Sequence, residues 1–400
     1  MAQIPQLTHQ PEWYKFISGA LLNSNGRYES LAAFFRDEFP ADTYPAKWKE
    51  LFGVAEENRT GEYTQLIGSN PVPVMATYVA YDAEGHLIAN EGVTLNKDTM
   101  PRMKIATNFN EKSVREGQYL ALRGGTPEWE RIFSAFYKDA AALIAGIETQ
   151  RSYTALQIES TGKYVSTNKN NNGGLTDLIF DFLKGAPATN RVAAGGFGSQ
   201  GKKYAWSNDN ANPIGDLMDM YAYYTDVLRV PYKGVFRMNK ATWNLLRNHK
   251  STIQAVAMWK TNGTIAAENL AGYVVTVKDI NEYLTDRLEL PAISVEDWVG
   301  VSQVIDPKTQ KAKKVPISGF ADNVVVLRPE GLIGELQWQA PTTMFSTEAN
   351  PLYLADGGKI GVQQEIFSAR KAMHFTAEFT GIPVPENIDY FLYLDVSKAA

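Results

Sequence analysis

The sequence contains no cysteine, which excludes disulfide frameworks, thiolate nucleophiles, zinc ribbons and iron–sulfur ligation. Histidine is also scarce: His9, His86, His249 and His374 are scattered, and no two of them have the spacing of metal ligands. We therefore expect no metal site, and we expect these histidines to be surface or structural side chains. No pairing of acids or nucleophile with base stands out, so the sequence predicts no catalytic residues, no cofactor-binding residues and no enzyme.

An excess of basic charge is missing as well, since 39 lysines and arginines face 44 acids and give a formal charge of −5. This balance disfavours a dedicated, sequence-specific DNA-binding protein, which needs cations to displace counterions from phosphates. No segment approaches the roughly 20 apolar residues that cross a bilayer, and the amino terminus lacks the features of a signal peptide. We expect a protein that has no membrane partner and stays in the cytoplasm where it is made.

The composition that is present is that of a folded chain. The 400 residues are 44% hydrophobic and 21% charged, outside the apolar-poor range of disordered proteins. A chain of this length exceeds the size at which one core stops growing, so two or more lobes are expected. No repeat of fixed period is visible, which excludes solenoids and propellers.

The first half of the chain changes pattern three times. Up to about residue 60, short amphipathic pieces around Trp13, Phe34 and Trp48 predict a train of short helices. From 71 to 119 the pattern predicts strands around a long polar loop that includes Asn96–Asp98. A long helix is then expected from Thr126 to about Ser160, with Thr126 as its N-cap and Gly162 as its stop.

An α/β lobe is predicted from about 186 to 345. Its expected elements are a helix opened by Asn212 and Pro213, a strand over 234–238, a helix capped by Asn239, and strands over 273–277 and 324–327. A strand over 178–183 precedes it, and the last fifty residues read mostly as strands, closing on 390–396.

The glycine-rich segment 195–203 contains parts of two nucleotide-binding fingerprints. Gly196, Gly198 and Gly201 match the dinucleotide pattern, but Lys203 stands where a phosphate loop needs Ser or Thr. Neither pattern is followed by a helix that would receive the phosphate, so a flexible surface loop is the favoured interpretation over a nucleotide site.

The densest basic cluster is Lys308, Lys311, Lys313 and Lys314, which lies between two extended pieces. A solvated hairpin tip is favoured over a polyanion-binding patch, because no aromatic residues alternate with the lysines.

The order of these parts resembles the major capsid protein of tailed bacteriophages, in the lambda-type family with the Hong Kong ninety-seven-like capsid fold. The segments that carry the resemblance are, in chain order, 100–104, the helix up to 160–163, 180–182 with 205–216, 235–243, 272–275, 324–334 and 381–387. Gln157–Glu159 only loosely matches the acidic, leucine-rich pattern that the family often has at the end of the long helix.

The resemblance implies an α+β fold with five parts. They are an N-terminal helical arm at 1–70, an extended loop with flanking strands at 71–119, a peripheral domain with the spine helix at 120–185, an axial domain at 186–345, and returning peripheral strands at 346–400.

The resemblance also implies a function. A major capsid protein of this family assembles into hexamers and pentamers, and these form an icosahedral shell around packaged double-stranded DNA. The implied partners are copies of the same chain and scaffolding, portal and decoration or head-completion proteins; the implied place is the virion capsid, assembled in the bacterial cytoplasm.

Two alternatives remain open at this point. A cellular nanocompartment shell shares the fold. A soluble α/β enzyme or ligand-binding protein would use a pocket that contains Trp206, Trp243 and Trp298.

Overall fold

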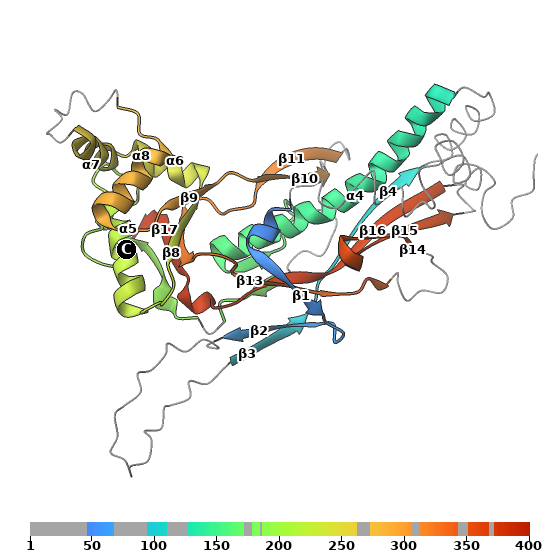
Figure 1. Cartoon of the computed structure of the whole chain (residues 1–400), viewed down its shortest axis with the longest axis horizontal. Coiled ribbons are helices and arrows are strands. Elements are labelled where there is room, and N and C mark those ends of the chain that lie inside the picture. The colour runs from blue at the N-terminus through green and yellow to red at the C-terminus, as the bar shows by residue number, and fades with distance from the viewer. Residues whose placement is uncertain are drawn as a thin grey trace, which may run out of the picture.

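The computed structural model describes residues 46–67, 94–109, 126–171, 178–184, 186–261, 273–305, 312–342, 351–367 and 372–400. They form an elongated α+β molecule, with a lobe of helices and strands at one end and a long helix beside a sheet at the other (Figure 1). The predicted α+β class is confirmed. The described residues contain no helix that is long and apolar enough to cross a membrane.

The long part of the molecule consists of one helix and one six-stranded sheet. The helix is α4 (Thr126–Thr161), which is 36 residues long and confirms the predicted spine helix. The sheet has the order β1-β13-β16-β15-β14, with β4 paired to β16. Its strands are β1 (Phe52–Glu57), β4 (Arg102–Phe109), β13 (Gly334–Gln339), β14 (Pro351–Ala355), β15 (Ile360–Phe367) and β16 (Ala372–Pro385).

Gly162 ends the spine helix as predicted. Its φ of 67° is in the left-handed region, and its N–H donates to the Ile158 carbonyl at 2.8 Å. A Cβ at this position would lie 2.4 Å from Leu183, so a glycine is needed for space as well as for backbone conformation.

The lobe is built on a five-stranded sheet of order β7-β17-β12-β8-β9. Its strands are β7 (Arg191–Ala194), β8 (Gly234–Asn239), β9 (Ile293–Glu296), β12 (Val324–Pro329) and β17 (Leu392–Ala399). Its helices are α5 (Pro213–Ala222), α6 (Lys240–Asn248), α7 (Lys250–Thr261) and α8 (Val277–Glu282), and π-helical turns η4 (Tyr223–Val227) and η6 (Tyr283–Arg287) extend α5 and α8. The predicted cap is confirmed, because Asn239 Oδ1 accepts from the Thr242 N–H at 2.8 Å.

The five-stranded sheet separates two apolar cores. In β12, Val325 and Leu327 belong to the core under the lobe helices, whereas Val326 belongs to the core that contains α4 and the six-stranded sheet. Adjacent strand residues point to opposite faces, so this sheet is a wall shared by both cores. That position explains why 324–327 is an unbroken apolar run, as is typical of strands buried on both faces.

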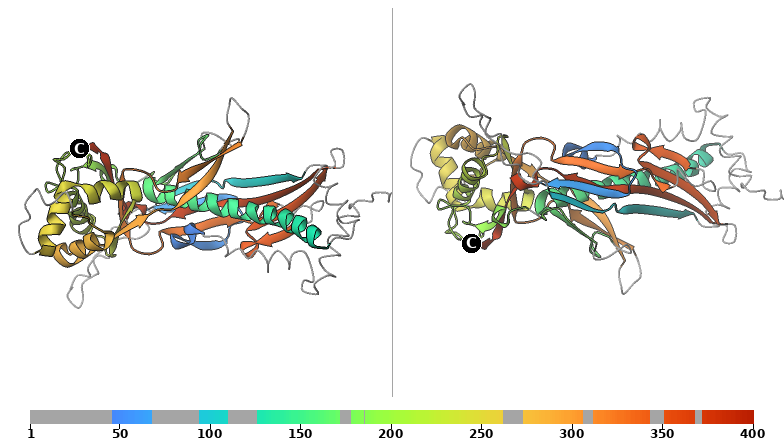
Figure 2. Two further views of the ribbon diagram at one scale, coloured as in Figure 1. Left: turned by 90° about the horizontal axis from the view of Figure 1, so that it is seen from above. Right: turned by 90° about the horizontal axis from the view of Figure 1, so that it is seen from below.

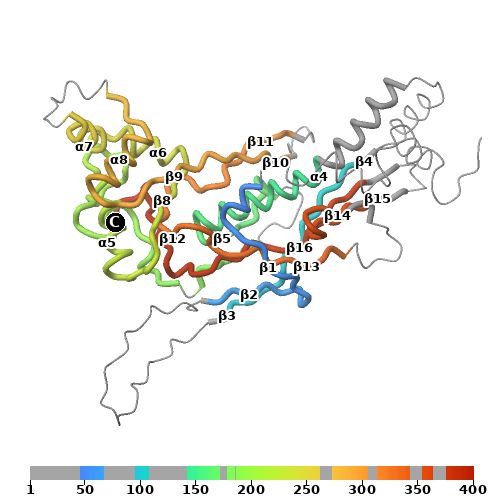
Figure 3. Tube along the Cα trace, viewed as in Figure 1, coloured from blue at the N-terminus to red at the C-terminus, as the bar shows by residue number. Residues whose placement is uncertain are grey.

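Three two-stranded ribbons complete the described structure. They are β2 (Glu62–Ile67) with β3 (Thr94–Thr99), β5 (Lys163–Val165) with β6 (Ile179–Asp181), and β10 (Val299–Ile305) with β11 (Ala312–Ser318). β6 and the β10–β11 hairpin confirm predicted strands. Figure 3 follows the chain through these ribbons. Short 3₁₀ turns are η2 (Lys47–Glu50), η3 (Ala188–Asn190), η8 (Asp356–Gly358) and η9 (Ile388–Tyr390).

The structure corrects three predictions of local structure. Residues 52–67 are strands rather than helix, because β1 completes the sheet edge beside β13 and β2 pairs with β3. Asn96–Asp98 lie in β3 rather than in a loop. The segment 273–276 is not a strand: Thr276 caps α8 with a reciprocal capping box to Asp279. The predictions for the pieces around Trp13 and Phe34, and for 71–93 and 110–119, lie outside the described residues.

The lobe contains two related units that the sequence reading did not separate. In each, a helix continues into a π-helical turn and then leads to a strand, and the two strands, β8 and β9, pair in parallel. Six residues of the first unit recur 60 positions later (279 − 219): Asp219/Asp279, Tyr223/Tyr283, Thr225/Thr285, Asp226/Asp286, Leu228/Leu288 and Pro231/Pro291. Each turn also ends at a left-handed residue, Arg229 with φ 52° and Glu289 with φ 54°.

Candidate functional site

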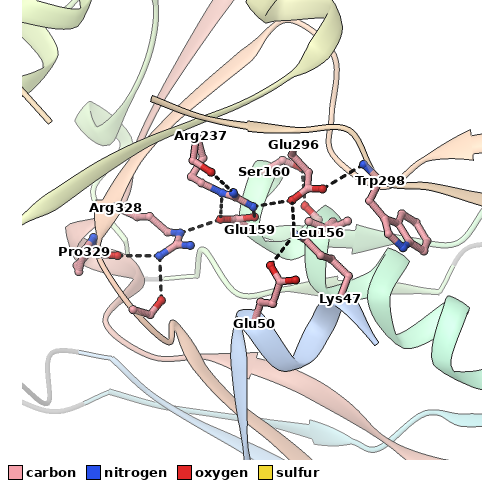
Figure 4. A network of polar contacts seen from close by, with 12 residues as sticks. Lys47, Glu50, Leu156, Glu159, Ser160, Arg237, Glu296, Trp298, Arg328 and Pro329 are labelled. Atoms are coloured by element: carbon pink, nitrogen blue, oxygen red, sulfur yellow. Dashed lines mark hydrogen bonds and ion pairs between the residues drawn. The ribbon is translucent and has the colours of Figure 1, made fainter. Parts of the chain in front are cut away.

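A buried carboxylate lies where the spine helix meets the lobe. Glu159, in the last turn of α4, is fully buried. Its Oε1 accepts from Arg237 Nε at 2.9 Å and from Arg328 Nε at 2.7 Å, and its Oε2 accepts from Arg237 Nη2 at 3.3 Å. Figure 4 shows this network. One carboxylate therefore joins α4 to two strands of the lobe.

The strand register explains why both arginines reach the same carboxylate. Arg237 in β8 is paired with Val326 in β12, and Arg328 lies two residues further along β12. Residues two apart on a strand share a face, so both guanidinium groups point to the α4 side of the sheet. Their neighbours Phe236, Met238 and Leu327 point into the lobe core.

The charges of this network stabilise one another. Burial alone would raise the pKa of Glu159, but the guanidinium groups of Arg237 and Arg328 outweigh burial and hold that pKa below its ordinary value. Burial would lower the pKa of Arg237, and Glu159 and Glu296 raise it. Removing one partner would leave a buried charge unpaired, which is far more destabilising than losing a surface ion pair.

The network continues to the segment that precedes the sheets. Glu296, at the end of β9, accepts from Arg237 Nη2 at 2.8 Å and lies 3.4 Å from Lys47 Nζ. The Trp298 N–H donates to Glu296 Oε1 at 3.1 Å. The ion pairs thus connect η2, α4, β8, β9 and β12, which are far apart in sequence (Figure 4).

A second buried cation fixes the middle of α4. The Arg151 side chain is fully buried, its Nη1 lies 2.8 Å from both Glu148 Oε1 and Asp356 Oδ2, and its guanidinium carbon lies 3.6 Å from the centre of the Phe379 ring. Trp48 Nε1 donates to the other oxygen of Glu148 at 2.5 Å. α4 is therefore held by polar contacts at its middle and at its end.

The glycine-rich segment is tied to two acidic side chains of the lobe. The Gly195 N–H donates to Asp216 Oδ1 at 2.8 Å, and the Gly201 N–H donates to Asp219 Oδ2 at 2.6 Å. The segment is exposed at several positions, but it is not the free loop that we expected, because Asp216 and Asp219 on α5 fix its backbone. Amides that could receive a phosphate instead bind carboxylates of the same chain.

Asp216 is an unusual acid in this arrangement. It is buried, and its second oxygen accepts from Trp206 Nε1 at 2.7 Å. Burial raises the pKa of Asp216 to about 6 and the charge of Asp219 adds to this rise, although the bonds from Trp206 and Gly195 oppose it.

The three tryptophans of the ligand-pocket alternative do not share a pocket. Trp206 and Trp243 are buried in the lobe core, whereas Trp298 packs against the other core. The pocket hypothesis is therefore wrong for these residues, whose indoles fill two separate interiors.

The one histidine whose side chain the structure describes, His249, has hydrogen-bond partners on both ring nitrogens. His249 is buried; its Nδ1 lies 2.7 Å from Ser251 Oγ and its Nε2 lies 3.0 Å from the Asn208 carbonyl oxygen. Within the described ranges, no cluster of three or more His, Asp or Glu side chains could hold a metal ion. His9 and His86 lie outside those ranges.

The basic cluster is described only in part. Lys313 and Lys314 lie on β11 and are exposed, as expected for a hairpin, whereas Lys308 and Lys311 lie outside the described residues.

The buried network lies in segments that the sequence marks as buried, but its ion pairs were not predicted. Glu159, Arg237 and Arg328 each stand in or beside an apolar stretch that the patterns predict to be buried. A charged residue inside a buried pattern requires a partner, and three such residues of compensating charge are the signal that could have been used.

One family model matches most of the chain. A sequence model of the family described as "Phage major capsid protein E" matches residues 43–357. No curated protein matches the chain.

Three solved structures have similar folds over most of their length. A protein of an E. coli CFT073 prophage assigned as a capsid protein is 16% identical, with 94% of this chain and 98% of that chain covered and a TM-score of 0.46. A phage-related protein from Bordetella bronchiseptica is 12% identical, with 89% and 94% covered and a TM-score of 0.42. The SrpI encapsulin of Synechococcus elongatus is 9% identical, with 88% of each chain covered and a TM-score of 0.38.

Proposed function

The chain belongs to the phage major capsid protein E family, and from this membership we propose that it builds a tailed-phage head from rings of five and six copies. The family match, which spans residues 43–357, is the observation that carries the proposal. As a member of this family the chain is a structural, shell-forming protein of the virion capsid. The rings, the enclosed double-stranded DNA and the partner proteins are the part that we propose beyond family membership.

The architecture supports a role in a shell. An elongated subunit with a long helix presents much surface for its mass, and such surface is useful when neighbouring copies cover it. The ion pairs of Glu159 join α4 to the lobe sheet, and the contacts of Arg151 join α4 to the six-stranded sheet. These contacts suit a subunit that must keep its shape when neighbouring copies bind to both ends.

We assign the domains from the two cores. The peripheral domain would contain α4 and the six-stranded sheet, within 120–185 and 346–400, and the axial domain would contain the lobe, within 186–345. Four strands do not follow these ranges: β1, β4 and β13 belong to the six-stranded sheet, and β17 belongs to the lobe sheet. Within the arm at 1–70 and the loop at 71–119, β1 to β4 pair inside the subunit, and the rest would contact neighbouring copies.

The formal charge of −5 is compatible with a container for DNA. A shell whose inner surface bound phosphates tightly would oppose release of the genome, so enclosure needs few cationic contacts. The proposed partners are scaffolding, portal and decoration or head-completion proteins, and the proposed place of assembly is the bacterial host cytoplasm.

Electron microscopy of the purified protein tests the proposal. The chain is expressed with and without the neighbouring genes of its source, and rings of five and six copies or closed shells are expected. Nuclease-protected double-stranded DNA in particles from infected cells would support a phage head, whereas an enclosed enzyme cargo would identify a nanocompartment. A monomer or small dimer under both expression conditions would refute the proposal.

A further inference from the structure

The β10–β11 hairpin presents an uncovered apolar face. Val299 is 57% exposed and Val301 is 59% exposed, and Val301 is paired with the exposed Pro316 across the two strands. The opposite face packs on the molecule: Gly300 is buried, and a Cβ there would lie 3.2 Å from Thr149 of α4. We call Val299, Val301, Pro316 and Lys314 the hairpin face.

The hairpin face is basic at its outer end. Lys314 is exposed and is paired with Gln303 on the same face. Lys308, Lys311 and Lys313 lie close to it in sequence, and Asp306 is the one acid between Val299 and Ser318. A partner for this face should therefore combine an apolar contact with negative charge.

A complementary surface lies beside β1, at the edge of the six-stranded sheet. Leu332 is 61% exposed and lies next to Gly53 of β1, where a Cβ would be 3.7 Å from its Cδ1. Glu335 adjoins Gly53 in the strand register, and Glu386 follows the β16 residue paired with Gly334. Both glutamates are exposed, and no salt bridge joins either to a cation among the described residues. We call Leu332, Glu335 and Glu386 the edge patch.

The two glutamates of the edge patch repel each other in the isolated chain. The carboxyl group of Glu386 is partly desolvated by its surroundings, which raises its pKa, and the charge of the neighbouring Glu335 raises it further. A cation brought to this place by a partner would relieve that repulsion.

The two surfaces lie on opposite flanks of the molecule. In the views of Figure 2, the β10–β11 hairpin leaves the body on one side of α4, whereas β1 lies on the other side beside β13. A chain with complementary patches on opposite flanks associates head to tail, and such heterologous contacts close into rings when the rotation between copies permits.

We propose that the hairpin face of one copy docks on the edge patch of the next copy within a ring. Val299, Val301 and Pro316 would cover Leu332, and Lys314 would neutralise Glu335 and Glu386. This inference rests on the proposed assembly into rings, and it assigns a specific contact to that assembly.

Chemical cross-linking tests the contact directly, because the natural chain has no cysteine to interfere. The double variant Val301→Cys/Leu332→Cys, treated with a short bis-maleimide, should give a ladder of covalent multimers that ends at five or six copies. Each single variant should stop at dimers or below. The matched control is Val274→Cys/Leu332→Cys, because Val274 is 75% exposed in the lobe but belongs to neither surface. An equal ladder from this control, or none from the test pair in assembled material, would overturn the contact.

Charge reversal gives an independent test. Lys314→Glu and Glu335→Lys should each lower the yield of assembled particles about tenfold, because each places like charges across the contact, and the double variant should restore assembly. Circular dichroism of each variant checks that the monomer folds. If wild type forms rings but Lys314→Glu assembles equally well, the contact is wrong and the proposed function stands. If wild type forms no rings or shells, the proposed function itself fails.

Discussion

At the scale of single residues, the most consequential side chain is Glu159. It is buried with two arginines that come from neighbouring strands, and each of the three charges depends on the others for its solvation. In such a cluster the net stabilisation of the intact set is small, but the cost of removing one member is large, since the remaining charges stay buried.

We therefore predict that Glu159→Gln destabilises the monomer by about 3–5 kcal/mol. Gln keeps the shape but removes the charge that faces Arg237 and Arg328. Urea unfolding at neutral pH measures the change. The matched control is Asp209→Asn, which breaks the exposed pair with Lys250 and should leave the unfolding curve unchanged. Equal stability of Glu159→Gln and wild type would show that the arginines find water or other partners.

Asp216 should make the stability of the folded chain depend on pH in the opposite direction to most acidic residues. Its pKa in the folded chain is about 6, above the ordinary value of 3.8, so the folded chain binds more protons than the unfolded chain between these two values. Stability from this group is thus highest below pH 3.8 and falls as pH rises toward 6. By contrast, the stabilisation from Glu159 is present at neutral pH and is lost as pH falls through its lowered pKa.

Trp206 reports on this ionisation, because its indole donates to Asp216. We predict a change in Trp206 fluorescence with a midpoint near pH 6, obtained as the difference between wild type and Trp206→Phe. The change should vanish in Asp216→Asn, which cannot ionise, and should persist in Asp209→Asn. A midpoint near pH 4 would mean that water reaches Asp216 in solution.

At the scale of elements, the sequence predicted those whose signals are local. The spine helix, the Asn239 cap and the apolar strand at 324–327 were predicted because periodicity and capping residues lie within each segment. β1 and β3 were missed, because what makes them strands is a partner distant in sequence, β13 for β1 and β2 for β3. α8 was missed for another reason. The apolar run 273–277 favoured a strand, although Thr276 and Asp279 have the spacing of a capping box that begins a helix.

The candidate site was predictable only in part for the same reason. The family resemblance indicated the function, and Glu159 stood in a segment already compared with that family. The convergence of Glu159, Arg237 and Arg328 depends on a strand pairing and on a helix end, neither of which a single sequence reveals. The related units containing η4 and η6 were overlooked because two copies give no period to detect.

The β2–β3 ribbon offers a test of how elements contribute to assembly. Its last register pair is Ile67 with Thr94, so a two-residue Asn-Gly turn can replace the whole segment 68–93 and close a hairpin. We predict that this variant folds with the thermal stability of wild type, because Tyr63 of β2 remains buried in the core, and that it fails to form closed shells. Calorimetry and electron microscopy measure the two effects.

A second variant, in which 68–93 keeps its length but has a scrambled sequence, separates the effect of length from that of sequence. If the short-turn variant assembles into normal shells, then 68–93 is dispensable for contacts between copies. If it unfolds, the segment belongs to the interior of the subunit instead.

At the scale of the whole molecule, the shared sheet determines how the two cores cooperate. β12 and β17 each send alternate side chains into both cores: Val325 and Leu394 face the lobe core, and Val326 and Tyr393 face the core around α4. A sheet used by both cores couples their unfolding, because neither core can keep its packing when the sheet dissolves. The ion pairs of Glu159 strengthen that coupling at the place where α4 meets the sheet.

We predict that the unassembled wild-type chain unfolds in a single calorimetric transition and that Glu159→Gln unfolds in two. In the variant, Arg328 loses the carboxylate that pairs with it and Arg237 keeps only Glu296, so the helix side loses stability while the lobe helices keep theirs. The lower transition should therefore belong to the part with α4, and limited proteolysis at a temperature between the two should leave the lobe intact. A single transition in Glu159→Gln, merely shifted to lower temperature, would mean that apolar packing across β12 and β17 couples the cores without the ion pairs. In that case the shared sheet alone is enough to make the two cores of the subunit unfold together.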